Sequence, residues 1–218
     1  MTRAWASMAT VAVVALISSC SSGDYEAGDG RYSYLRADFG MVHTEGSPVR
    51  ADYMVTDGGN RIAFHEQPVV DWLQKPDTVY RALVHYDVST FNVFSVSQVS
   101  VVEVEDKPGS VGVGTDPLDI ESAWMDGGFL NIGFAVRTGK VDQKDERQRV
   151  GVVREAEMTD WQGRGHLFLR VVHAQNGVPE YYTVHGYMSL PVTEDMRGVV
   201  IHLSANTYKG GKSFVFDD

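Results

Sequence analysis

The chain has 218 residues, of which 43% are hydrophobic, and a formal net charge of −10 at pH 7. Nucleic-acid binding depends on Lys and Arg side chains that neutralise phosphates, so this acidic balance argues against a nucleic-acid partner. The single cysteine, Cys20, excludes a disulfide within the chain.

The N-terminus has the pattern of an export signal. Arg3 supplies a positive charge, residues 4–17 are uncharged and largely apolar, and Ile17-Ser18-Ser19-Cys20 matches a bacterial lipobox. We therefore predict a lipoprotein signal peptide over residues 1–19 and acylation of Cys20 with lipid chains such as palmitate. A plain secretory signal is the alternative. A membrane-spanning helix needs ~18 consecutive apolar residues, and this run is shorter.

Acylation would determine where the protein resides. Each buried methylene contributes ~0.8 kcal/mol, so several acyl chains on one cysteine anchor a protein stably. Removing residues 1–19 takes away only Arg3, which lowers the net charge from −10 to −11. Residues 20–30, with three acidic side chains, are expected to form a tether. We expect a lipid-anchored protein of the cell envelope, at the outer membrane, on either its periplasmic or its surface face.

Residues 31–105 have the pattern of short β-strands. Residues 78–88 alternate with period two and have one apolar face, which indicates a half-buried strand. The runs 49–55 and 61–66 flank a turn-forming cluster, which predicts a hairpin. Between 91 and 104 the apolar residues switch twice from one alternating face of the strand to the other. This pattern favours β-bulges of the kind that bend a strand at a barrel corner.

A second β-unit is predicted after a Gly- and Pro-rich break at residues 106–119, which we interpret as a linker. Residues 120–218 contain seven short strand patterns separated by turn signals, as is typical of a β-sandwich. Asn176-Gly177 predicts a hairpin turn between two of them, and the polar run 139–148 predicts a solvated loop tip. Helix is expected only as short turns at 69–73 or 192–197. The predicted strands span residues 120–125, 129–136, 149–158, 166–172, 181–190, 199–205 and 213–216.

Short motifs in this framework resemble those of the NigD-like lipoproteins of Bacteroidetes. Trp124 is followed by Gly127-Gly128 and then by Phe129-Leu130-Asn131, downstream of a lipobox and an N-terminal β-region. Similar segments lie at 34–38, 57–59 and 208–216. The resemblance implies an all-β fold, with an N-terminal OB-like barrel over residues 31–105 followed by a C-terminal β-sandwich over 120–218. It also suggests an association with bacteriocins and supplies no catalytic residues. Here we expect Trp124 and Asn131 to serve as packing and turn residues.

The chain lacks the local motifs of catalysis. It contains no Gly-x-Ser-x-Gly, no His-Glu-x-x-His, no phosphate-binding loop and no dinucleotide fingerprint. We therefore expect no enzyme activity and no cofactor. No two histidines have the close spacing that zinc sites usually show, so we expect no metal site. The histidines are His43, His65, His85, His166, His173, His185 and His202.

Three functions remain open from the sequence. The leading hypothesis is a non-catalytic envelope lipoprotein that binds a protein partner, as an accessory or bacteriocin-linked factor. The alternative is a glycan-binding module on the barrel face, with Tyr32 and Tyr34 as candidate contacts, because OB-type barrels bind oligosaccharides there. The third is an envelope hydrolase with an unrecognised serine or carboxylate site, such as the acids Asp116, Asp119 and Glu121.

Overall fold

The structure, a computed structural model, describes residues 34–106, 114–140 and 147–217. The predicted signal peptide, Cys20, the tether, Tyr32, half of the predicted linker and most of the predicted polar loop lie outside these ranges. Residues Tyr34–Asp218 belong to one compact unit. Its described part is all-β, as predicted, with a single 3-10 turn at Glu194–Met196. Those residues therefore contain no helix long enough to cross a membrane.

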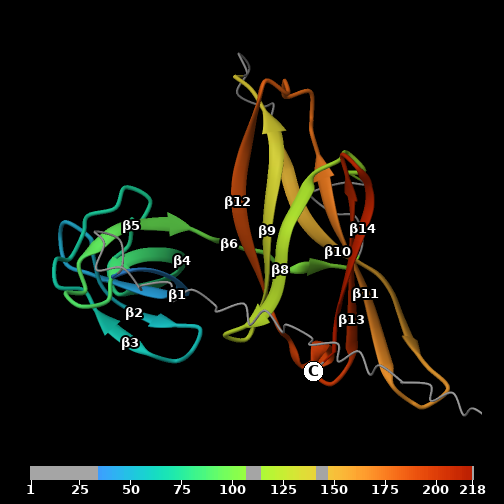
Figure 1. The fold of residues 1–218 in the computed structure, drawn as a ribbon, viewed down its shortest axis with the longest axis horizontal. Coiled ribbons are helices and arrows are strands. Elements are labelled where there is room, and N and C mark those ends of the chain that lie inside the picture. Colours follow the sequence, from blue (N-terminus) through green and yellow to red (C-terminus); the bar gives the residue numbers. More distant parts are fainter. Residues whose placement is uncertain (1–33, 107–113, 141–146, 218) are drawn as a thin grey trace, which may run out of the picture. The chain divides into compact units, whose positions relative to one another are not determined.

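The first five strands form one antiparallel sheet in the order β3-β2-β1-β4-β5 (Figure 1). Their bounds are β1 Leu35–Glu45, β2 Arg50–Thr56, β3 Arg61–Ala63, β4 Thr78–Asp87 and β5 Val93–Gln98. The predicted hairpin between β2 and β3 is confirmed. On β4 the alternation is also confirmed, because Ala82, Val84 and Tyr86 are buried in the core of this sheet. The opposite face of β4 is covered as well, and this burial is not evident from the pattern.

The sheet does not close into the predicted barrel. In the described chain β3 and β5 are edge strands, with no ladder between them. β3 has only three residues, and the segment after it bridges the edges by single contacts. Its His65 amide donates to the Phe91 carbonyl at 3.2 Å. The Trp72 indole N–H donates to the Val96 carbonyl at 3.1 Å, and Leu73 is buried beside it.

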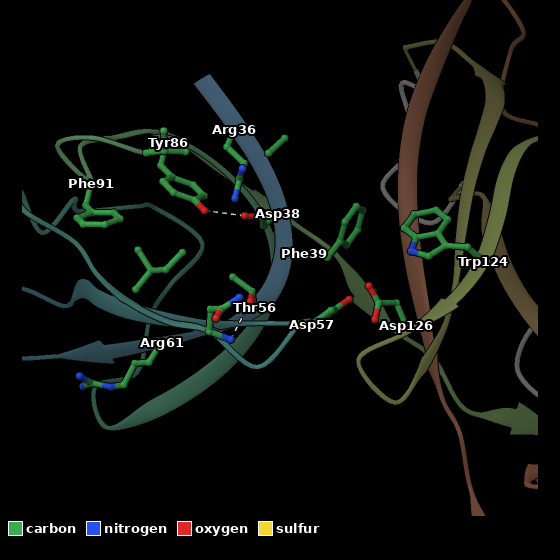
Figure 2. Close-up of a pocket in the computed structure, with 15 residues that line it drawn as sticks. Arg36, Asp38, Phe39, Thr56, Asp57, Arg61, Tyr86, Phe91, Trp124 and Asp126 are labelled. Atoms are coloured by element: carbon green, nitrogen blue, oxygen red, sulfur yellow. Dashed lines mark hydrogen bonds between the residues drawn. The ribbon is translucent and has the colours of Figure 1, made fainter. Parts of the chain in front are cut away.

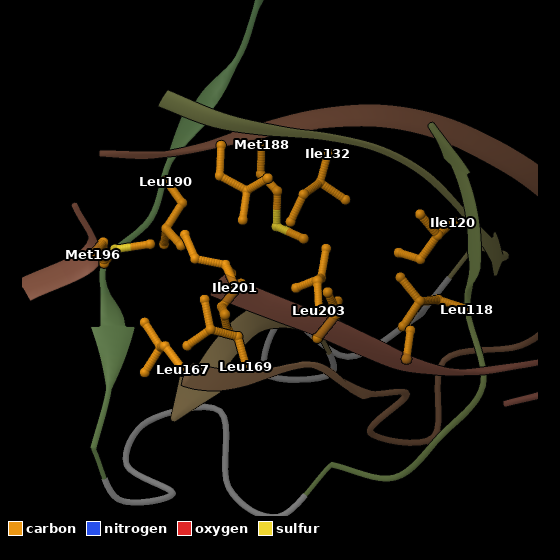
Figure 3. Packing of buried hydrophobic residues seen from close by; sticks show 14 of the residues in the cluster. Leu118, Ile120, Ile132, Leu167, Leu169, Met188, Leu190, Met196, Ile201 and Leu203 are labelled. Atoms are coloured by element: carbon orange, nitrogen blue, oxygen red, sulfur yellow. The ribbon is translucent and has the colours of Figure 1, made fainter. Parts of the chain in front are cut away.

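The remaining strands form a β-sandwich of two sheets, in the orders β14-β13-β11-β10-β7 and β6-β12-β9-β8. The core lies between the sheets, where Met188, Leu190 and Ile132 of one sheet meet Leu169 and Leu203 of the other (Figure 3). Alternate residues of each strand point inward, as the period-two patterns predict. The bounds are β6 Ser100–Val101, β7 Val104–Glu105, β8 Asp119–Asp126, β9 Phe129–Thr138, β10 Arg149–Thr159, β11 Gly165–Ala174, β12 Tyr182–Pro191, β13 Val200–Thr207 and β14 Gly210–Phe216.

The predicted hairpin at Asn176-Gly177 is wrong. Both residues have positive φ, 50° and 76°, and the Val178 amide donates to the Gln175 carbonyl, so a tight turn is present. However, β11 pairs with β10 and β13, whereas β12 pairs with β9 and β6. The turn therefore carries the chain from one sheet of the sandwich to the other, and a local turn signal does not distinguish these two connections.

Two short parallel strands join the sandwich to the chain that precedes it. β6 pairs with β12 and β7 pairs with β10, so each occupies an edge of a different sheet. The passage from the first sheet to the sandwich lies at Val99, which is buried and donates its amide to the Arg81 carbonyl. This passage precedes the linker predicted at 106–119. Strands of two residues carry too little pattern to be assigned from sequence.

A buried arginine on β4 connects the first sheet to the sandwich. The Arg81 side chain is fully buried and forms a two-pronged ion pair with Asp57, with one arm at 2.6 Å. Its Nε donates to the Ser189 hydroxyl at 3.1 Å, and Nη2 also donates to the side-chain amide oxygen of Asn131 at 3.0 Å. Ser189 in turn donates to the same Asn131 oxygen at 2.6 Å. Asn131 is thus a buried acceptor within a strand, not the predicted turn residue.

Aromatic rings surround this polar cluster. Phe39 of β1 makes edge-to-face contacts with Trp124 and Tyr187, at centroid distances of 5.1 and 5.2 Å. The Arg81 guanidinium lies 4.3 Å from the centre of the Phe129 ring. Rings with such geometry add a specific attraction to their buried area. Asn131 and Ser189, on the outer faces of β9 and β12, are therefore buried because the first sheet covers this part of the sandwich.

Gly127, in the turn between β8 and β9, is required by this packing. A Cβ atom built on Gly127 would lie 2.4 Å from Asp57 Cγ, and its φ is +60°. Only glycine avoids both the clash and the strained backbone. The short motifs at 57–59 and 124–131 thus meet at one place and hold the two β-units together.

We predict that Arg81→Met destabilises the protein by about 3–5 kcal/mol, because it leaves the Asp57 carboxylate buried without a counter-charge. Asp57 is only 7% exposed. Urea unfolding measures the change. The double variant Arg81→Met/Asp57→Ala removes both charges and should recover part of the loss. A single variant within about 0.5 kcal/mol of wild type would contradict a structural role for the pair.

Candidate functional site

An open groove of about 660 Å³ lies next to the Arg81 cluster. This volume is within the range typical of ligand sites. The groove is bounded by the first half of β1, by the β2–β3 turn, and by the end of β8, from which Trp124 and Asp126 project (Figure 2). Its lining residues are Arg36, Ala37, Asp38, Phe39, Thr56, Asp57, Gly58, Asn60, Arg61, Ile62, Tyr86, Val88, Phe91, Trp124 and Asp126.

Two acids of the groove are held by fixed partners. Asp57 is paired with Arg81, and Asp38 accepts a hydrogen bond from the Tyr86 hydroxyl at 2.6 Å. Burial, together with the neighbouring Asp38 carboxylate, raises the pKa of Tyr86 to about 12. The phenol therefore stays protonated at neutral pH and acts as a donor, which excludes it as a general base there.

The other charged groups are more exposed. Arg61 lies with its guanidinium 3.8 Å from the centre of the Tyr53 ring, which orients it along the wall. Asp126 is exposed, and its carboxylate accepts the Gly127 amide at 2.8 Å. Arg36 and Asp126 present both signs of charge between the rings of Phe91 and Trp124 (Figure 2). Such a lining can bind and orient a ligand by stacking and charge-assisted hydrogen bonds.

The lining residues do not form a nucleophile–base pair. They contain no His, Ser, Cys or Lys, and the hydroxyl of Thr56 accepts the Asn60 amide within the turn at 3.1 Å. Within the described residues, no three His, Cys, Asp or Glu side chains are grouped so that they could hold a metal ion. What the groove geometry supports chemically is recognition.

The residues predicted as contacts lie elsewhere or outside the described chain. Cys20 and Tyr32 precede the first described residue. Tyr34 is 48% exposed and adjoins β1, but the groove lining begins two residues later, at Arg36. Three further tyrosines lie on or beside β12, where Tyr187 packs on Phe39, whereas Tyr181 and Tyr182 are exposed at the start of the strand.

The acids Asp116 and Glu121 are engaged with separate groups. Asp116 accepts the Gln175 amide at 2.7 Å, and Glu121 lies 2.9 Å from a ring nitrogen of His185. These contacts bind loops and strands to one another. The two acids share no partner in the described chain, and neither lines the groove.

Two histidines that are distant in sequence form a pair on the outer face of the sandwich. His166 Nδ1 lies 2.9 Å from His202 Nε2, and His166 Nε2 lies 3.3 Å from Asp160. Because β11 and β13 are parallel neighbours, the pair has no signature in sequence spacing. Burial, and then the neighbouring His166, lower the pKa of His202. The folded state therefore favours neutral His202.

We predict that His202 makes stability pH-dependent. A pKa lowered on folding contributes stability that is complete above the unfolded-state value, about 6.5. That stability is lost as pH falls through the lowered folded-state value. Thermal melts between pH 7.5 and 5 should therefore show a smaller decrease for His202→Gln than for wild type. His65→Gln, at an exposed site, controls for loss of a histidine, and an unchanged decrease in His202→Gln would contradict the assignment.

Known proteins share this fold at low sequence identity. A crystal structure of a NigD-like immunity protein from Bacteroides caccae aligns with a TM-score of 0.63 and 18% identity, over 84% of this chain and 96% of that one. A putative toxin related protein from Parabacteroides distasonis aligns with a TM-score of 0.61 and 18% identity, over 84% and 93%. A protein of unknown function from Bacteroides vulgatus aligns with a TM-score of 0.59 and 17% identity, over 84% of this chain and 91% of that one. No curated protein matches the sequence significantly.

The sequence itself matches a family model. The model describes the NigD-like C-terminal beta sandwich domain and covers residues 100–217. Its first residue coincides with the start of β6, the first strand of the sandwich. The expected family resemblance is confirmed by this match, which covers more than half of the chain. The chain belongs to the NigD-like family.

Proposed function

We propose that this protein is a non-catalytic binding protein of the cell envelope that recognises a protein partner through the groove beside Trp124. The observation that carries the proposal is that the groove is preformed. Its walls come from both β-units, and the hydrogen bonds from the buried Arg81 side chain to Ser189 and Asn131 fix them relative to each other. Preorganised walls reduce the cost of ordering side chains on binding.

The lining supports a protein as partner. Trp, Tyr and Arg are the residue types enriched at the energetic centres of protein interfaces. Here Trp124, Tyr86, Arg36 and Arg61 line one open surface. The net charge of the chain, −10, disfavours nucleic acid. The names of two structural neighbours, an immunity protein and a toxin related protein, support a bacteriocin-linked partner as one possibility within this proposal.

The anchor is the second component of the proposal. Acylated Cys20 would hold the folded unit at the outer membrane through residues 20–33, and the lipobox sequence supports this arrangement. A lipid-anchored binding unit needs no membrane-spanning element of its own.

A glycan is the second candidate ligand, because aromatic rings border the groove. Phe91 is 42% exposed, and Trp124 is half-buried on the opposite wall. Sugar rings present apolar faces that can pack on such aromatic surfaces. This candidate predicts retention on polysaccharide columns that weakens in Trp124→Ala.

We predict that cross-linking on intact native cells, followed by pull-down of the tagged full-length chain, recovers a specific protein. Trp124→Ala should reduce recovery about tenfold or more, as expected when an interface anchor is truncated. Asp126→Arg is a second groove variant at an exposed site with no aromatic packing role. Melting curves of both variants show whether the fold is retained.

Trp161→Ala is the matched control for this experiment. Trp161 lies in the turn between β10 and β11, is 90% exposed, and does not line the groove. Recovery should match wild type. Equal recovery with both groove variants would refute the groove as the binding site, and a clean protein background would favour the glycan candidate.

We also predict that Cys20→Ser moves the protein from the membrane fraction to the soluble fraction after cell lysis. The substitution removes the thiol that would carry the lipid. Metabolic labelling with an alkyne analogue of palmitate should label wild type and leave Cys20→Ser unlabelled. Retention of Cys20→Ser in the membrane fraction would show that another element anchors the chain.

A further inference from the structure

One edge of β1 is unpaired along the wall of the groove. β1 pairs with β4 from Leu35 onward, but its pairing with β2 begins only at Gly40. Residues 35–39 therefore have a ladder on one side only. Four of them, from Arg36 to Phe39, line the groove (Figure 2).

The hydrogen-bond directions show which groups are free. The Tyr34 carbonyl accepts from Val88, at the end of β4, so residues 34, 36 and 38 turn their backbone groups toward β4. The Phe39 carbonyl accepts the Asp57 amide at 2.9 Å on the other side. Leu35, Ala37 and Phe39 therefore face the groove. In the described chain, only the Phe39 carbonyl among these groups has a backbone partner there.

This edge lacks most of the devices that protect sheet edges against pairing. Exposed edges are commonly blocked by charged side chains, especially lysine, by proline or by a bulge. Residues 35–39 contain neither lysine nor proline, and the bulge of β1 lies further on, between His43 and Thr44. Their two charged side chains, Arg36 and Asp38, lie on the same face of the sheet as Tyr86. Within the described residues, the N–H and C=O groups of Leu35 and Ala37 are thus without a backbone partner on this side, beside a preformed groove.

The two faces of the edge would select different side chains. Arg36 and Asp38 lie opposite Tyr86 and Val84 in the register, so an added strand would direct alternate side chains toward the face that carries these two charged residues together with Tyr86 and the apolar Ile62. The intervening side chains would point toward Phe39, Trp124 and Asp126. An aromatic ring beside an exposed carboxylate favours lysine or arginine at that position.

We propose that the free edge of β1 binds an extended peptide segment of the partner by β-strand addition, with an apolar side chain toward Tyr86 and a basic neighbour toward Trp124 and Asp126. This mode deepens the proposed function and rests on it. Main-chain hydrogen bonds supply affinity in strand addition, and alternate side-chain pockets supply specificity.

The test uses the full chain from residue 20, with Cys20→Ser for solubility, as bait for a displayed library of random 12-residue peptides. A selected peptide is then synthesised for binding and hydrogen-exchange measurements. By NMR, the Ala37 amide should exchange quickly in the free protein and at least about tenfold more slowly in the complex. The amides of Arg36 and Asp38, which face β4, should be slow in both states.

Ala37→Pro removes the central free N–H without removing a donor to β4, since proline is tolerated on a free edge. It should weaken peptide binding about tenfold or more. Gln98→Pro is the matched proline control on β5. Val99 directs its amide to β4, so the Gln98 amide points away from the ladder. Its peptide affinity should equal that of wild type.

Several results would overturn strand addition. In the exchange experiment, these are an Ala37 amide that already exchanges slowly in the free chain, including through self-association, or one whose exchange rate does not change in the complex. In the binding experiments, they are full peptide affinity in Ala37→Pro or a library that yields no peptide. A peptide that depends on Trp124 but leaves the Ala37 amide unchanged would overturn only this mode and leave the proposed function standing. If the library yields no peptide and the cross-linking experiment recovers no cellular partner, both strand addition and the proposed function would be refuted.

Discussion

The arrangement of this molecule depends on the ion pair between Arg81 and Asp57. A buried guanidinium is tolerated only when its donors are satisfied, and here the partners come from three parts of the chain: the β2–β3 turn, β9 and β12. If the two β-units separated, the ion pair would stay on the first sheet but would be exposed, and the hydrogen bonds from Arg81 to Asn131 and Ser189 would be lost. The hydrogen bonds from Arg81 to Asn131 and Ser189 therefore specify how the first sheet meets the sandwich, more than they add net stability.

The groove follows from this constraint. Because Asp57 is bound to Arg81, it contributes shape to the groove and little free charge. Its turn ends pairing between β1 and β2 at Gly40, so the first half of β1 lacks a neighbour on that side. The same residues that close the contact between the two β-units thus leave a sheet edge open. The binding surface and the structural joint are made from one set of side chains.

The sequence predicted the class, most strands and the family, because strand alternation and turn residues act locally. Tyr86 and Val84 could be assigned to a core by period alone. The burial of Arg81, Asn131 and Ser189 could not, since a polar side chain on the outer face of a strand ordinarily indicates solvent. The same limit explains the wrong hairpin at 176–177 and the unpredicted groove. Glycine pairs near Asp57 and Trp124 were the only signals, and they mark turns without showing that the turns meet.

The parallel strands β6 and β7 have a consequence for how the chain folds. β6 pairs with β12, more than eighty residues later, and this pairing completes an edge of one sheet of the sandwich. β7 pairs with β10 and completes an edge of the other sheet. Contacts of such sequence separation are slow to form, because loop closure precedes any gain in stability. We therefore expect β6 and β7 to pair late, after the local hairpins β8–β9, β10–β11 and β13–β14, so the segment that joins the two β-units is the last part of the sandwich to become ordered.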